Sequence, residues 1–206
     1  MSIIRDKIVE KAIWEANKGT WKPTPQEIQD FFRVAGLYPP TLAMAKGSLE
    51  GGNTLYPKLA NGVWSPAGGK DAQGNPKVMV IHWCGIFACY VLKKWGGLSV
   101  YWASGVGIKG SGVKRIDDPV NLDGLQPGDV AWIRGKADSK GHYTWHHFIV
   151  TKVDRKSNQL ESVDGNSTGN TISWHSNDSP AAAPGPKKLT GNDDDNRIRG
   201  YYQLNV

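Results

Sequence analysis

The stretch that decides the fold lies near the middle of the chain and reads Trp83-Cys84-Gly85-Ile86-Phe87-Ala88-Cys89-Tyr90-Val91-Leu92-Lys93-Lys94-Trp95. Its almost unbroken apolar run is too long for a strand. The lysine pair and the following Gly96-Gly97 are typical of the C-terminal end of a helix. We therefore predict a buried helix over Cys84–Trp95, entered from an extended segment at Val78–Ile81.

The sequence after this helix favours a sheet. Beyond the turn Pro127-Gly128-Asp129, short β-type segments are separated by turn residues, and no helical pattern intervenes. These segments are Val130–Arg134, His146–Asp154, Gln159–Val163, Thr171–Trp174 and Arg197–Leu204. Such a series indicates an antiparallel sheet and an α+β class. Gly185–Asn196 is expected to be a loop with Asp193–Asp195 at its solvated tip.

The N-terminal third is expected to hold two helices. Apolar residues recur at helical spacing over about the first 17 residues. A capping box at Thr24–Glu27, with proline at the first helical position, opens the second helix, and Gly36 ends it. From Gly47 to Pro76 the residues show no sustained period, which predicts an irregular connection.

Composition places the chain among ordinary globular proteins. Its 206 residues, 39% of them hydrophobic and 21% charged, suffice for one domain with a core. No run approaches the roughly 20 apolar residues of a membrane span, and Met1–Glu10 lacks the layout of a secretory signal. The net charge of +6 favours anionic partners, but its scattered lysines and arginines resemble no nucleic-acid-binding module.

Two thiols fall on the predicted buried helix. Five residues apart, Cys84 and Cys89 would have Cα atoms roughly 8 Å apart, beyond the reach of a disulfide. Cys89 is interpreted as a small buried hydrophobic residue. Cys84 begins the helix, where the helix dipole lowers the pKa of a thiol and where its own N–H can donate to an oxyanion.

A nucleophilic thiol needs a base and a group that orients the base. His146 begins one predicted strand, and Asp164 and Asn166 lie just beyond the next, so a hairpin would bring an imidazole to either of them. The neighbouring His147 should point to the opposite face, so only one of the two histidines is expected to meet the thiol.

Two further readings concern ligands of the site. His82, Cys84, His146 and Asp164 are chemically possible zinc ligands, but their spacing matches no zinc motif, so neither metal nor cofactor is expected. Trp83, Trp102 and Trp145 could line a groove for sugar or peptide, the last two from loops near the thiol.

Five motifs together resemble one family. The segment from His82 to Phe87 looks like the Trp-Cys-x-x-Phe helix start of the CHAP amidases, relatives of the NlpC/P60 peptidases in the papain-like superfamily. The other four are Leu125-Gln126-Pro127-Gly128-Asp129-Val130, His146-His147-Phe148-Ile149-Val150, Asp164-Gly165-Asn166 and Arg199-Gly200-Tyr201. Their order and spacing agree with the family over about residues 80–204. The chain would then divide into a helical and loop region, 1–75, packed on a CHAP-like catalytic domain, 76–206.

The resemblance implies a papain-like fold and a peptidoglycan hydrolase. The family cuts amide bonds as N-acetylmuramoyl-L-alanine amidases or stem-peptide endopeptidases. It implies Cys84 as nucleophile, His146 as general base and acid, and Asp164 with Asn166 as orienting groups. Aspartate stands where the family usually has glutamate, which leaves open which of the two holds the imidazole.

The same resemblance frames the expected biology and its alternatives. The chain would act on peptidoglycan as a monomer, as a phage lysin or an antibacterial effector delivered by specialised secretion. An effector would travel with a cognate immunity protein. The alternatives are an enzyme of the same fold that cleaves or deamidates proteins, and a non-catalytic wall-binding module with a basic, Trp-rich surface.

Overall fold

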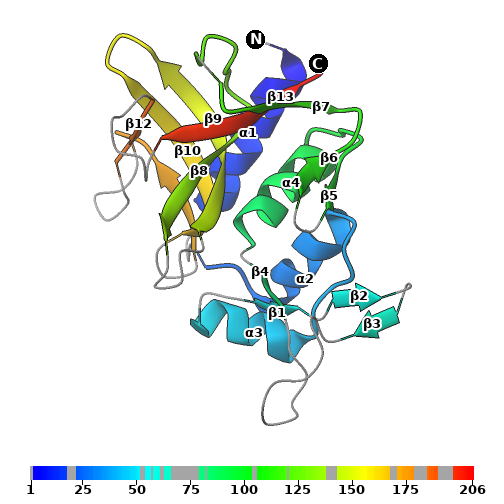
Figure 1. Cartoon of the computed structure of the whole chain (residues 1–206). Coiled ribbons are helices and arrows are strands. Elements are labelled where there is room, and N and C mark those ends of the chain that lie inside the picture. Colours follow the sequence, from blue (N-terminus) through cyan, green and yellow to red (C-terminus); the bar gives the residue numbers. More distant parts are fainter. Residues whose placement is uncertain are drawn as a thin grey trace.

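The computed structural model describes most of the chain and shows an α+β fold (Figure 1). The described residues are 2–17, 22–51, 54–56, 58–60, 63–65, 79–81, 83–103, 106–119, 121–137, 143–167, 171–178, 185–189 and 197–206. The expected acidic loop tip at Asp193–Asp195, and His82, lie outside these residues. N-terminal helices pack on an antiparallel sheet of seven strands, as the α+β prediction requires.

The two predicted N-terminal helices are confirmed. Helix α1 spans Ile3–Ala16 and α2 spans Pro25–Val34. The capping box of α2 is complete, because the side chain of Thr24 accepts from Glu27 N while the Glu27 carboxylate accepts from Thr24 N at 2.7 Å. Gly36 ends the helix with a φ of 84°, a conformation that glycine adopts without strain.

The prediction of an irregular connection from Gly47 onward is wrong where the structure describes it. A third helix, α3, covers Leu42–Gly51, and the hydroxyl of Thr41 caps it by accepting from Met44 N at 3.2 Å. Three short strands follow, β1 (Thr54–Tyr56), β2 (Lys58–Ala60) and β3 (Val63–Ser65). Strand β1 pairs with β4 (Met79–Ile81), which leads to the central helix, and β2 pairs with β3. Strands this short carry no period that sequence could reveal.

The five predicted strands all belong to the main sheet. They are β8 (Val130–Ala137), β9 (Tyr143–Asp154), β10 (Gln159–Ser167), β11 (Thr171–His175) and β13 (Ile198–Leu204). The sequence did not predict β7 (Val113–Asp117), at one edge, or β12 (Lys187–Lys188), which pairs with β10 within the expected loop. The order is β11-β10-β9-β8-β13-β7, and all pairs are antiparallel. A separate hairpin joins β5 (Tyr101–Ala103) to β6 (Gly107–Lys109).

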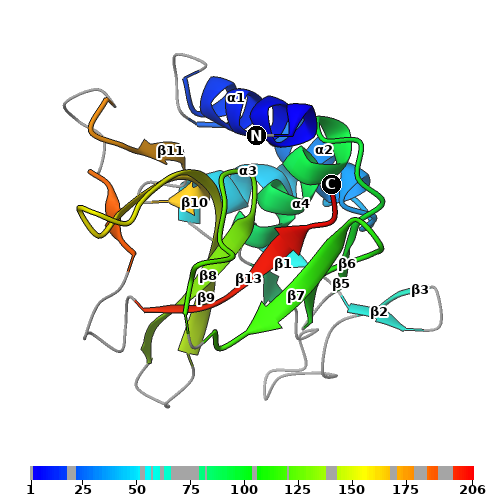
Figure 2. The ribbon, with the colours of Figure 1, turned by 90° about the horizontal axis from the view of Figure 1, so that it is seen from above.

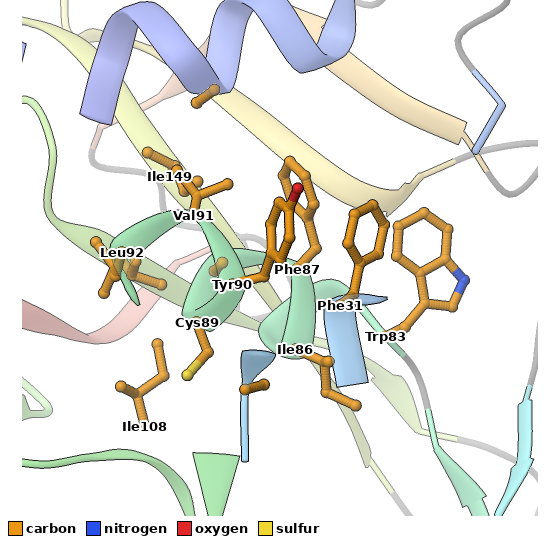
Figure 3. Packing of buried hydrophobic residues seen from close by; sticks show 14 of the residues in the cluster. Phe31, Trp83, Ile86, Phe87, Cys89, Tyr90, Val91, Leu92, Ile108 and Ile149 are labelled. Atoms are coloured by element: carbon orange, nitrogen blue, oxygen red, sulfur yellow. The ribbon is translucent and has the colours of Figure 1, made fainter. Parts of the chain in front are cut away.

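Helix α4 (Cys84–Lys94) is the centre of the main core, as predicted. All its residues from Cys84 to Leu92 are buried. Figure 3 shows its side chains meeting Phe31 of α2, Ile149 of β9 and Ile108 of β6 on different sides. Each large apolar side chain buried in this way contributes about 1.5–3 kcal/mol to stability. The helix is thereby held between the N-terminal helices and the sheet (Figures 1 and 2).

The other face of the sheet carries a smaller core. It consists of Leu125, Ala131, Phe148, Val150, Leu160, Leu189, Ile198 and Tyr201. Along β9, Phe148 belongs to this second core and Ile149 to the main one, as expected for alternating strand residues. Both faces of the sheet are therefore covered.

A buried ion pair connects α1 to the turn that opens β8. Arg5 Nη1 donates to Asp129 Oδ1 at 2.7 Å and to the carbonyl of Pro127 at 2.9 Å. The Asp129 carboxylate also accepts from the backbone N–H groups of Gln126 and Leu204, both at 2.9 Å. Gly128, with a φ of 92°, leaves room for the Arg5 side chain, since a Cβ there would lie 3.3 Å from it.

We expect Arg5→Ala to lower the free energy of unfolding by roughly 3–5 kcal/mol, because it leaves a buried carboxylate without its cation. Urea denaturation measures the change. The matched control is Arg33→Ala, which removes an exposed ion pair with Asp30 and should cost less than about 1 kcal/mol. Equal losses for the two variants would contradict this account of Arg5.

Candidate active site

Cys84 occupies the first turn of α4, where backbone N–H groups have no partner within the helix. The preceding residue, Trp83, makes no side-chain cap hydrogen bond. The sulfur lies 3.8 Å from the carbonyl oxygen of Trp145, at the backbone of β9. Cys84 is 3% exposed, so the thiol lies just below the surface at the junction of helix and strand.

An imidazole and a carboxylate lie next to this thiol. The Nε2 of His146 and the Oδ2 of Asp164 are 2.7 Å apart, across neighbouring strands β9 and β10. Asp164 is in register with Phe148, two residues from His146 on the same face, so the pair forms diagonally across the sheet. The His146 side chain is 28% exposed and that of Asp164 2%. The carboxylate is thus shielded and the imidazole is open on one side.

Both histidines of the doublet lower the pKa of the Cys84 thiol, an effect that the expectation of a single histidine at the thiol did not include. They leave β9 on opposite sides: His146 meets Asp164, whereas the ring of His147 packs edge-on against Trp102. The sulfur, close to the strand backbone at Trp145, is within reach of both. His147 is 9% exposed and its Nδ1 has no hydrogen-bond partner, whereas His146 has a carboxylate.

These contacts favour a thiolate next to an imidazolium. Burial would raise the pKa of the Cys84 thiol, but interactions with His146 and His147 outweigh it and hold that pKa well below its usual value. Burial lowers the pKa of His146, but the hydrogen bonds to Asp164 and Cys84 outweigh this effect and raise the pKa above its usual value, to about 10. The ion pair is therefore the expected state of the free site at neutral pH.

Asp164 is the buried anion of the site. Its Oδ1 accepts from the hydroxyl of Ser162 at 2.7 Å, and its Oδ2 faces His146, His175 and Lys187. Burial would raise the pKa of this carboxyl, but the positive charge of Lys187 and the hydrogen bond to His146 hold it well below its usual value. The carboxylate is therefore ionised when it orients the imidazole.

Asn166, the other candidate for orienting His146, is placed differently. It has a φ of 54°, at an irregularity in the pairing of β10 with β11, and its buried Oδ1 has no hydrogen-bond partner. Between the two candidates, Gly165 allows close packing, since a Cβ there would lie 2.7 Å from the Cβ of Phe87 on α4. The geometry thus pairs His146 with Asp164.

The three tryptophans expected near the substrate have different surroundings. Trp83 is fully buried beside Phe31, as Figure 3 shows, so it is a core residue and the expectation that it lines a groove is not met. Trp102 lies on β5 and Trp145 on β9, both in strands rather than loops. The ring of Trp102 covers Gly85, and Trp145 is 48% exposed directly before His146.

Within the described ranges, no three His, Cys, Asp or Glu side chains cluster closely enough to hold a metal ion. The helices described there include none with the length and apolar character to span a membrane.

Sequence reasoning missed three residues that surround Asp164. Ser162 shares the face of β10 with Asp164, a weak signal because alternating polar residues also occur at solvated faces. His175 and Lys187 come from β11 and β12, far along the chain, and no local motif connects them to the carboxylate.

Comparison of the chain with family models, with curated proteins and with solved structures found no match.

The two thiols should differ sharply in reactivity toward iodoacetamide. Burial raises the pKa of Cys89 to about 12, and its side chain lies in the core (Figure 3). At pH 6.5 we expect one alkylation per native molecule, at Cys84, at least about tenfold faster than in His146→Ala. Mass spectrometry of the peptides locates the label. The ion pair would be contradicted if Cys89 were labelled preferentially, or if Cys84 were alkylated no faster than a free thiol.

Proposed function

We propose that this protein is a cysteine hydrolase that cuts an amide bond, with Cys84 as nucleophile and His146 as general base and acid. The observation that carries the proposal is the row formed by Cys84, His146 and the buried Asp164 at the start of α4. Each member has the partner its role requires: a nucleophile beside a base, and a base oriented by an anion.

The reaction would proceed by acyl transfer. The Cys84 thiolate attacks the amide carbonyl carbon and forms a C–S bond, and the resulting oxyanion accepts from the free backbone N–H of Cys84. His146 gives its proton to the departing nitrogen, which breaks the C–N bond and leaves a thioester. His146 then takes a proton from water, whose oxygen attacks the thioester and restores the thiolate.

Only one arrangement of the imidazole serves both of its contacts. Nε2 of His146 is held by Asp164, which leaves Nδ1 as the nitrogen that would exchange the proton with the sulfur. Asp164 keeps the ring in this orientation and stabilises the imidazolium. We assign His147, which has no carboxylate partner, to contact with the thiol rather than to base catalysis.

Peptidoglycan is the substrate that we propose. The five motifs that resemble the CHAP amidases support it, and the helix–sheet arrangement around Cys84 is compatible with the papain-like fold of that family. The net charge of +6 suits an anionic wall polymer. The exposed indole of Trp145, next to His146, offers an apolar surface to a sugar or stem peptide.

Digestion of purified peptidoglycan tests nucleophile, substrate and bond together. We expect wild type to release fragments with new amino and carboxyl ends, and Cys84→Ala to lose at least about a thousandfold in rate. Mass analysis of the fragments identifies the bond. The matched control, Cys89→Ala, lacks only the core thiol and should keep its activity.

Outcomes of the digestion distinguish the rival functions. Wall binding without cleavage, equal in wild type and Cys84→Ala, would identify a binding module. If peptidoglycan is not cleaved but protein substrates are cleaved or deamidated in a Cys84-dependent reaction, the proposed substrate is wrong and the proposed chemistry stands.

The orienting residue is tested by two substitutions in β10. Asp164→Asn should lower kcat by roughly 10²–10⁴-fold, because the imidazolium loses its anion and the ring its preferred tautomer. Asn166→Ala should change kcat less than about tenfold, since its Oδ1 has no partner. Steady-state rates on a soluble amide substrate measure both, and a larger loss for Asn166→Ala would reverse the assignment.

A further inference from the structure

One carboxylate oxygen in the site faces three basic side chains. Oδ2 of Asp164 lies 2.7 Å from Nε2 of His146, 2.8 Å from Nζ of Lys187 and 3.5 Å from Nε2 of His175. Its partner oxygen, Oδ1, accepts from Ser162. The catalytic role proposed for Asp164 needs only His146, so the ammonium group is an additional feature of this chain.

Lys187 is built into this position. It lies on β12, which pairs with β10 through Leu160, and its side chain is 18% exposed. Its Nζ also lies 5.2 Å from the ring centroid of Phe148, the residue in register with Asp164. The next residue, Lys188, is exposed, as alternation along a strand requires. Of the two adjacent lysines, one is directed into the site.

We propose that Lys187 is a positioning residue of the active site, which holds Asp164 by a buried ion pair and shares its negative charge with His146. The proposal rests on the function assigned above to the Cys84, His146 and Asp164 row. It adds the ammonium group of Lys187 to that row, so that the imidazolium receives part, rather than all, of the stabilisation a buried carboxylate can give.

His175 does not supply the same charge. Burial lowers the pKa of His175, and the charges of Lys187 and His146 lower it further against the opposing effect of Asp164. Its imidazole is therefore neutral at physiological pH, whereas the ammonium group of Lys187 forms an ion pair with Asp164 at 2.8 Å. With Lys187 present, the charges of the ion-pair state are one thiolate, one imidazolium, one carboxylate and one ammonium.

The shared carboxylate has a predictable effect on proton transfer. His146 must give its proton to the leaving nitrogen, and an imidazolium paired with an undivided carboxylate would release it less readily. Removing the ammonium also leaves the negative charge of Asp164 without its second counter-charge, and this uncompensated charge opposes formation of the Cys84 thiolate on the other side of His146. Loss of Lys187 should therefore slow proton donation and raise the pH at which the thiolate forms.

The test compares three variants at two neighbouring lysines. Lys187→Met removes the charge, Lys187→Arg keeps it, and Lys188→Met removes the exposed charge next to it. The pH dependence of Cys84 alkylation by iodoacetamide gives the midpoint of thiolate formation without any substrate. We expect Lys187→Met to raise this midpoint by about 0.5–1 pH unit, and Lys187→Arg and Lys188→Met to leave it within about 0.2 unit of wild type.

Catalysis gives the second readout. Lys187→Met should lower kcat about tenfold with little change in KM, and Lys187→Arg should recover most of the loss. A merely structural lysine would affect stability and leave the alkylation midpoint unchanged, which would overturn the proposal. If the Met variant does not fold, Lys187→Gln, which keeps a polar donor without the charge, decides by the same midpoint shift.

The two proposals fail in different ways. If peptidoglycan is not cleaved but the alkylation midpoint is shifted in Lys187→Met, the proposed substrate is wrong and the role of Lys187 stands. Efficient digestion with the same midpoint in wild type and Lys187→Met would reject the role of Lys187 and keep the function.

Discussion

The burial of α4 on every side is the constraint on which the site depends. Phe31, Ile108 and Ile149 contact the helix from three different elements, so it cannot rotate or slide without opening the main core. The first turn of α4 is thereby held against the backbone of β9. The sulfur of Cys84 is placed by the packing of side chains farther along the helix, such as Phe87 and Leu92, which have no chemical role themselves.

Charge in the site is organised around one buried carboxylate. Asp164 is 2% exposed, and an unpaired anion at that depth would be costly. Ser162, His146 and Lys187 provide its hydrogen bonds and counter-charges. The same carboxylate that needs these partners for stability orients the imidazole, so the electrostatics of folding and of the proposed chemistry are coupled.

Local patterns in the chain were sufficient for the main elements. The apolar run after Cys84, the capping box at Thr24 and the β-type segment at His146–Asp154 each depend on residues within a few positions of one another. The short strands from Thr54 to Ser65 and the hairpin at Tyr101 escaped prediction because three residues cannot show a period. Helix α3 was missed although Thr41 offered a cap after two prolines.

The same difference between local and long-range interactions applies to the candidate site. Sequence could name Cys84 as the start of a helix and place His146 in a strand, because both depend on neighbours in the chain, although the strand begins earlier, at Tyr143. It could not choose between Asp164 and Asn166, since a register shift and a positive φ separate their environments. Nor could it place Lys187, because strand pairing and side-chain reach across distant segments are set by the packed whole, and no local pattern encodes them.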